Sequence, residues 1–214
     1  TFDAGQLSDW DLTLRDLTKS AIDCHKMFGR IHQSRIEYPE ANTNGNKDKG
    51  TQKMEILVEN RQTRPLPTEM LTHAAEVSLL DLGMPNNCEL SLLFVDDEEI
   101  AEINESYLGH EGPTNVISFA MQEGELPPDL KDVLLGDIII STDTAAKEAD
   151  EGGITFDERL LQLMLHGILH LTGYEHVNDE VEAKVMEKRG QELLDNVAKT
   201  LSLTLSAPVE NFTV

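Results

Sequence analysis

Cysteine and long apolar runs are both scarce in this chain of 214 residues. Its two cysteines, Cys24 and Cys88, lie far apart and outside any C-x-x-C pair, so they cannot form the disulfide framework of a small secreted domain. No apolar run approaches the roughly 18–20 residues of a membrane-spanning helix, and the amino-terminal segment lacks the layout of a signal peptide. We therefore expect a cytoplasmic protein, with no membrane association of residues 54–214.

Positively charged residues are also few, because the chain has 17 Lys and Arg against 40 Asp and Glu, a formal net charge of −23. Residues 1–53 hold eight of each sign, so the whole acidic excess falls in residues 54–214. This balance disfavours binding of nucleic acid by bulk electrostatics, since neutralising phosphates requires clustered Lys and Arg. The candidates for a small basic patch are Arg61, Arg64, Lys131, Lys147 and Arg159.

Composition divides the chain into three parts. Residues 1–40 carry apolar side chains at helical spacing and predict a helical tail. This tail weakly resembles the carboxy-terminal end of membrane-anchored HD-domain phosphohydrolases, which would make it a piece of a fused upstream protein. Residues 41–53 are rich in Asn, Gly and Lys and predict a flexible linker. Residues 54–214 predict an α+β domain with a small, mainly four-stranded sheet and about five helices.

The strands of this domain are predicted from short apolar runs, and its helices from capping residues and apolar periodicity. The expected strands are residues 54–60, 88–95, 114–121 and 135–141. The expected helices are 67–83, 97–108, 142–149, one that begins at Thr155 and one that begins at Asn178. Two capping pairs are predicted, Asp96 with Glu99 and Thr155 with Glu158. The expected core positions of the last helix are Val181, Val185, Leu193, Leu194 and Val197.

One predicted helix is mostly apolar but carries Gln162, His166 and His170 at intervals of four, which places them on one face. Two imidazoles four residues apart can aim two nitrogens at one metal ion, and a turn at Gly173 can bring in His176 as a third ligand. Three protein ligands leave one position open for water, as in a catalytic zinc site. A single His on such a helix could instead be a hydrogen-bonded core residue.

The residue after the first His separates two zinc chemistries. The pattern matches the metalloprotease motif H-E-x-x-H-x-x-G-x-x-H except that Gly167 replaces the Glu. In the proteases this Glu is the general base toward the metal-bound water, so its loss disfavours peptide hydrolysis. Gly167 either leaves room for a bulky substrate beside the metal or permits close helix packing.

The His motif HGILHLTGYEH, the segment PTNVISF at 113–119 and the segment LLGDIII at 134–140 together resemble the YbeY family of zinc-dependent endoribonucleases. The resemblance covers about residues 54–199. It implies a compact domain with one Zn²⁺ in a cleft and hydrolysis of single-stranded RNA. It also implies small-subunit rRNA maturation and ribosome quality control, with rRNA and the small ribosomal subunit or its proteins as partners. By the same resemblance, the zinc ligands and catalytic residues are His166, His170 and His176.

The chain departs from this family where substrate contacts are expected. Leu108 stands where many members have an Arg thought to meet the RNA backbone. The possible substrate-binding residues are His110, which could approach phosphate as a cation, Asn115, where Asp is common, and Ser118, on a strand expected beside the cleft. Ser118 can equally be an ordinary strand residue. Asp137 either orients a ligand His or caps a turn.

The expected function is therefore that of a zinc-dependent, single-strand-specific endoribonuclease, with water or the ribose 2′-hydroxyl attacking phosphorus. One alternative is a metalloprotease or another zinc hydrolase. A second alternative is a ribosome-assembly binding factor with a mainly structural metal site. In that case Leu108 would reflect a loss of nuclease activity.

Overall fold

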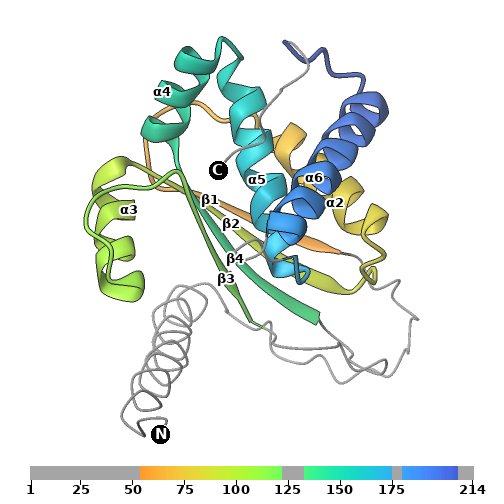
Figure 1. Cartoon of the computed structure of the whole chain (residues 1–214), viewed down its shortest axis with the longest axis horizontal. Coiled ribbons are helices and arrows are strands. Elements are labelled where there is room, and N and C mark those ends of the chain that lie inside the picture. Colours follow the sequence, from red (N-terminus) through yellow and green to blue (C-terminus); the bar gives the residue numbers. More distant parts are fainter. Residues whose placement is uncertain (1–53, 122–132, 175–179, 207–214) are drawn as a thin grey trace, which may run out of the picture.

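The computed structural model describes residues 54–121, 133–174 and 180–206. These residues form a four-stranded sheet with helices on both of its faces (Figure 1). The predicted α+β class and the predicted four-stranded sheet are confirmed. The predicted tail at residues 1–40 and the linker at 41–53 lie outside the described residues.

The strand order in the sheet is β1-β2-β4-β3. Strands β1, β2 and β4 are parallel, whereas β3 pairs antiparallel with β4. Their bounds, each within two residues of the prediction, are Glu55–Asn60 (β1), Cys88–Val95 (β2), Val116–Ala120 (β3) and Val133–Ser141 (β4). Strand β3 is therefore at the edge of the sheet, and within the described part of the chain its outer side pairs with no further strand.

Three helices pack together on one face of the sheet and enclose the larger core (Figure 1). They are α2 (Thr68–Asp81), α5 (Phe156–Leu171) and α6 (Glu180–Leu201). Helix α4 (Thr142–Gly152) follows β4 and packs against α5. None of the helices in the described ranges is both long and apolar enough to cross a membrane.

The opposite face of the sheet carries α3 (Asp97–Ile103), which continues into a π-helix, η1 (Asn104–Leu108). The sequence predicts one continuous α-helix over 97–108, but its last turn is widened. Gly109 ends the turn in the left-handed conformation, with φ of 70°. Single π turns of this kind are frequent at functional sites.

At both predicted capping pairs the side chain of the N-cap residue caps the helix. The Asp96 carboxylate accepts a hydrogen bond from the backbone N–H of Glu99 at 2.9 Å, at the start of α3. The Thr155 hydroxyl accepts one from the backbone N–H of Glu158 at 3.2 Å, at the start of α5. Each bond satisfies a donor that has no partner within its own helix.

The prediction for the core face of α6 is correct in its second half and wrong in its first. Leu193, Leu194 and Val197 are fully buried, whereas Val181 and Val185 are 69% and 53% exposed. Met186 is buried instead, one residue and about 100° around the helix from Val185. The predicted start at Asn178 lies outside the described residues.

Candidate functional site

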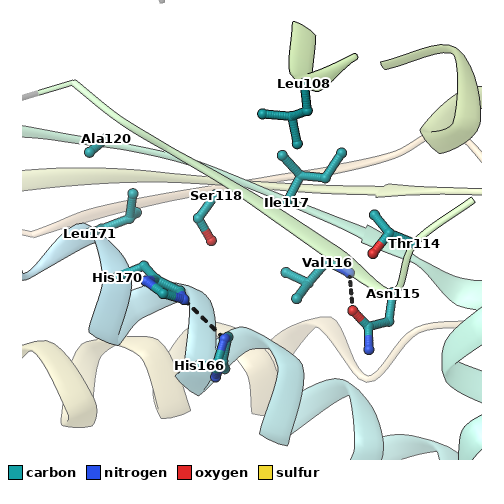
Figure 2. Close-up of a pocket in the computed structure, with 10 residues that line it drawn as sticks. All are labelled: Leu108, Thr114, Asn115, Val116, Ile117, Ser118, Ala120, His166, His170 and Leu171. Atoms are coloured by element: carbon teal, nitrogen blue, oxygen red, sulfur yellow. Dashed lines mark hydrogen bonds between the residues drawn. The ribbon is translucent and has the colours of Figure 1, made fainter. Parts of the chain in front are cut away.

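The structure brings together two of the three predicted histidines. The Nε2 atoms of His166 and His170 lie 3.0 Å apart, and their rings meet edge to face with centroids 4.7 Å apart (Figure 2). His166 is buried, and His170 is partly buried one turn further along α5. The pair results from the four-residue spacing on a helix that is otherwise buried in the core.

A cavity of about 440 Å³ follows the outer edge of β3, between α5 and η1. The two histidines and Ser118 lie on one side of the strand, and Leu108 lies on the other side (Figure 2). The predicted placement of this strand at the edge of the sheet, beside a cleft that holds the His pair, agrees with this arrangement. The complete lining is Leu108, Thr114, Asn115, Val116, Ile117, Ser118, Ala120, His166, His170 and Leu171.

The two nitrogens are arranged as metal ligands would be. Imidazole nitrogens bind Zn²⁺ at about 2.0–2.1 Å, so two ligands of one tetrahedral ion lie roughly 3.3 Å apart, close to the separation of His166 and His170. The third predicted ligand, His176, lies outside the described residues. Among the described side chains, no group of three His, Cys, Asp or Glu converges on one point. The two described nitrogens therefore fit as two ligands of one metal ion.

Gly167 allows α5 to pack closely on the sheet. A Cβ atom at this position would lie 2.8 Å from Ile138 Cγ2 and 2.9 Å from Ser118 Oγ. The space expected for a bulky substrate is thus already filled by neighbouring side chains. The Glu of the metalloprotease motif would clash at this position, which weighs against peptide hydrolysis.

The three predicted substrate-binding residues differ in their positions. Ser118 points from β3 toward the His pair (Figure 2). Asn115 also lines the cavity, but its side chain already makes internal hydrogen bonds, to Glu148 Oε1 at 3.0 Å and from the Val116 N–H at 2.8 Å. His110 is exposed and does not line the cavity, so its contact with substrate stays a prediction.

Asp137 does not lie beside the His pair. It is buried on β4, and its neighbour Ile138 points toward α5 and Gly167. Because successive side chains of a strand point to opposite faces, the Asp137 carboxylate lies on the face of the sheet away from α5. It therefore cannot orient His166 or His170, the first of the two predicted alternatives for this residue.

The predicted basic patch is absent from the described residues. Arg61 forms ion pairs with Glu59 and Glu99. Arg64 forms one with Asp143, with 3.6 Å between Arg64 Nη2 and Asp143 Oδ1. Lys147 is exposed on α4, and Lys131 lies outside the described residues.

Arg159, another residue of the predicted patch, is buried within the protein. It is 7% exposed and pairs with Glu148 at 2.9 Å, and its Nη1 donates to Gln162 Oε1 at 3.0 Å. Sequence reasoning missed this network. The available signal was the row of polar residues at 159, 162, 166 and 170 on an otherwise apolar helix.

Most of the chain is similar in sequence to known proteins. The family model described as "Endoribonuclease YbeY" matches residues 51–198. The protein named Endoribonuclease YbeY from Geobacter metallireducens is 49% identical over 142 residues, which are 65% of this chain and 93% of that protein. The protein of the same name from Syntrophus aciditrophicus is 54% identical over 141 residues, 65% of this chain and 88% of that protein.

A solved structure is also similar. The solution structure of TM1509 from Thermotoga maritima aligns with a TM-score of 0.48 and 24% identity, over 74% of this chain and 95% of the other. The family match begins at residue 51, so it lends no support to the resemblance of residues 1–40 to HD-domain phosphohydrolases.

Proposed function

The chain belongs to the YbeY family of endoribonucleases, and we propose on that basis that it cleaves single-stranded RNA, with one bound zinc ion, during maturation of small-subunit rRNA. The proposal includes a cytoplasmic location and contact with the small ribosomal subunit or its proteins. The observation that best supports it is the convergence of His166 and His170 in a cavity along an edge strand.

We assign zinc binding to His166, His170 and His176. The Nε2 atoms of the first two lie 3.0 Å apart, and the third follows from the motif. A zinc ion held there would lower the pKa of a bound water and polarise a phosphate oxygen. Gly167 supplies no proton acceptor, so the base has to be another group, such as a phosphate oxygen of the substrate.

The edge strand provides the remaining substrate contacts. The hydroxyl of Ser118 points to the His side of the cavity and can donate a hydrogen bond to a phosphate oxygen. The outer backbone edge of β3 offers further hydrogen-bonding groups to an extended ligand. An unpaired RNA strand can lie along such an edge, whereas a rigid duplex presents its bases only within its grooves.

Leu108 gives the cavity an apolar rim on the side of β3 opposite the histidines. An apolar side chain in this place suits a base or ribose better than a phosphate. Binding of this kind is local and is compatible with a strongly acidic protein.

The decisive experiment measures cleavage of an end-labelled single-stranded rRNA fragment by the zinc-loaded chain, with the same fragment in a duplex for comparison. His170→Ala, checked for folding by circular dichroism, reveals any contaminating nuclease. We expect the unmodified protein to cut the single strand and the variant to lose at least about 100-fold in rate, because a metal ligand is removed. If both proteins leave the RNA intact but the unmodified one retains zinc and binds RNA, the proposal fails and a ribosome-assembly factor becomes the better account.

A further inference from the structure

Two polar side chains of α5, Arg159 and Gln162, are buried at 7% and 1% exposure. Burying a charge is costly unless it is paired and hydrogen-bonded. Arg159 meets this condition by directing Nε and Nη2 to a single oxygen, Glu148 Oε2, at 2.9 Å each. Its Nη1 holds the Gln162 Oε1 at 3.0 Å. The Nε2 of Gln162 has no hydrogen-bond partner within the described part of the chain, so its amide is oriented through Arg159.

The second oxygen of Glu148 extends this network to the edge strand. Glu148 Oε1 accepts a hydrogen bond from Asn115 Nδ2 at 3.0 Å. The backbone carbonyl of Asn115 in turn accepts from the Ser141 N–H at 3.0 Å, where β4 ends. One chain of polar contacts therefore connects α5, α4 and the first residue before β3.

Both ends of this chain of contacts adjoin the candidate site. Gln162 lies one turn before His166 on the same face of α5. Asn115 lines the cavity three residues before Ser118. Among the described residues, strand β3 has a neighbouring strand on one side only, so a contact at its start contributes more to its position than it would in a central strand.

The Glu148 carboxylate favours a hydrogen-bond donor at position 115. An Asp at this position would place its carboxylate about 3 Å from that of Glu148, and the repulsion between the two negative charges would disfavour ionisation of both. The amide of Asn115 instead donates to the carboxylate. The presence of Asn at position 115 thus has a physical reason within this chain.

We propose that Arg159, Glu148 and Asn115 are positioning residues, which hold the edge strand and Ser118 at the correct distance from the His pair for RNA cleavage. The inference rests on the proposed ribonuclease function for its kinetic test. Its structural test is independent of any cleavage.

The test is an exchange of charge between two residues. Asn115→Asp sets a carboxylate against Glu148, and adding Glu148→Gln restores a donor and an acceptor facing each other. Asn196→Asp is the matched control, because Asn196 Nδ2 also donates to a carboxylate oxygen, of Asp81, on the α6 surface away from the cavity. Two quantities are measured for each protein: hydrogen exchange of the amides of residues 116–120, and kcat and KM on the single-stranded RNA.

We expect Asn115→Asp to speed exchange in β3 about tenfold. The same substitution should lower kcat about tenfold to 100-fold, as a small misplacement of reacting groups does. The double variant should recover both quantities to within about threefold, and the Asn196→Asp control should change neither.

The proposal is overturned if Asn115→Asp leaves exchange and kcat unchanged, or if the double variant is no better than the single one. If the unmodified chain does not cut RNA, the proposed function fails. Faster exchange in Asn115→Asp that the second substitution reverses would still support the positioning of β3.

Discussion

At position 108 this chain has a leucine, where the resemblance to the family led us to expect an arginine. It ends the π-helix, is 39% exposed and borders the cavity opposite the His pair. A cation at this position would reach the same cavity, whereas the leucine offers only apolar contact. The effect of the difference should therefore appear in phosphate binding and not at the proposed metal site.

We predict that Leu108→Arg strengthens RNA binding. KM should fall about threefold to tenfold, since one partly exposed charge contact contributes roughly 1 kcal/mol. The dependence of log Kd on log salt should steepen by about 0.7 for the one added phosphate contact. Kd is measured in the His170→Ala background, so that the RNA stays intact during titration.

Leu80→Arg is the control for this substitution. Leu80 is 54% exposed on α2 and does not line the cavity, so the same charge is added away from the site. Equal gains from both substitutions would mean that only net charge matters and that Leu108 is not at a phosphate position.

At the scale of secondary structure elements, α5 combines two demands. It has to bury nearly all of its surface between the sheet and the helices α2, α4 and α6, and it has to present two imidazoles to a cavity. Gly167 makes both possible, because without a side chain the helix can approach Ile138 and Ser118. The glycine next to the first His is therefore explained by packing within this protein.

We predict that Gly167→Ala destabilises the fold by about 1–3 kcal/mol, since a Cβ 2.8 Å from Ile138 overpacks the core. This loss should exceed the gain of about 1 kcal/mol that Ala normally brings to a helix. Urea denaturation followed by circular dichroism measures the difference.

Gly152→Ala on α4 provides the comparison. In the ranges that the structure describes, its new Cβ would meet only Ile154 Cγ1, at 3.9 Å, so stability should stay unchanged or rise by up to about 1 kcal/mol. If Gly167→Ala is as stable as Gly152→Ala, the close approach of α5 to the sheet is not a constraint.

For the molecule as a whole, the net charge of −23 is the dominant electrostatic property. Three of the residues predicted to form a basic patch, Arg61, Arg64 and Arg159, are paired with carboxylates. No Lys or Arg among the described residues lines the cavity. Under the proposed function, RNA would therefore be bound through the site itself, by hydrogen bonds, apolar contact and a metal ion held there.

We predict a weak salt dependence for RNA binding. The slope of log Kd against log salt should be smaller than about 2, whereas a protein with six to ten phosphate contacts gives a slope several times larger. Fluorescence anisotropy with a single-stranded oligonucleotide from about 50 to 300 mM salt measures it. A steep slope would contradict this account and mean that RNA contacts cationic side chains outside the cavity.

Much of this protein followed from short-range patterns in its sequence. The four strands were predicted from short apolar runs. The caps at Asp96 and Thr155 and the pairing of His166 with His170 join residues three or four positions apart, where local geometry leaves few options. The family also followed from its motifs and is confirmed by the match over residues 51–198.

Only the tertiary structure decided which faces are covered and what each polar residue contacts. Val185 and Met186 are both apolar, and the packing of α6 determined that Met186 is the buried one. Arg159 could have been a surface cation in the sequence, but it is buried against Glu148, which also holds Asn115. Such contacts join residues that are 11 and 33 positions apart, so no local pattern contains them. They arise when packing removes water from polar groups, which must then find partners within the protein.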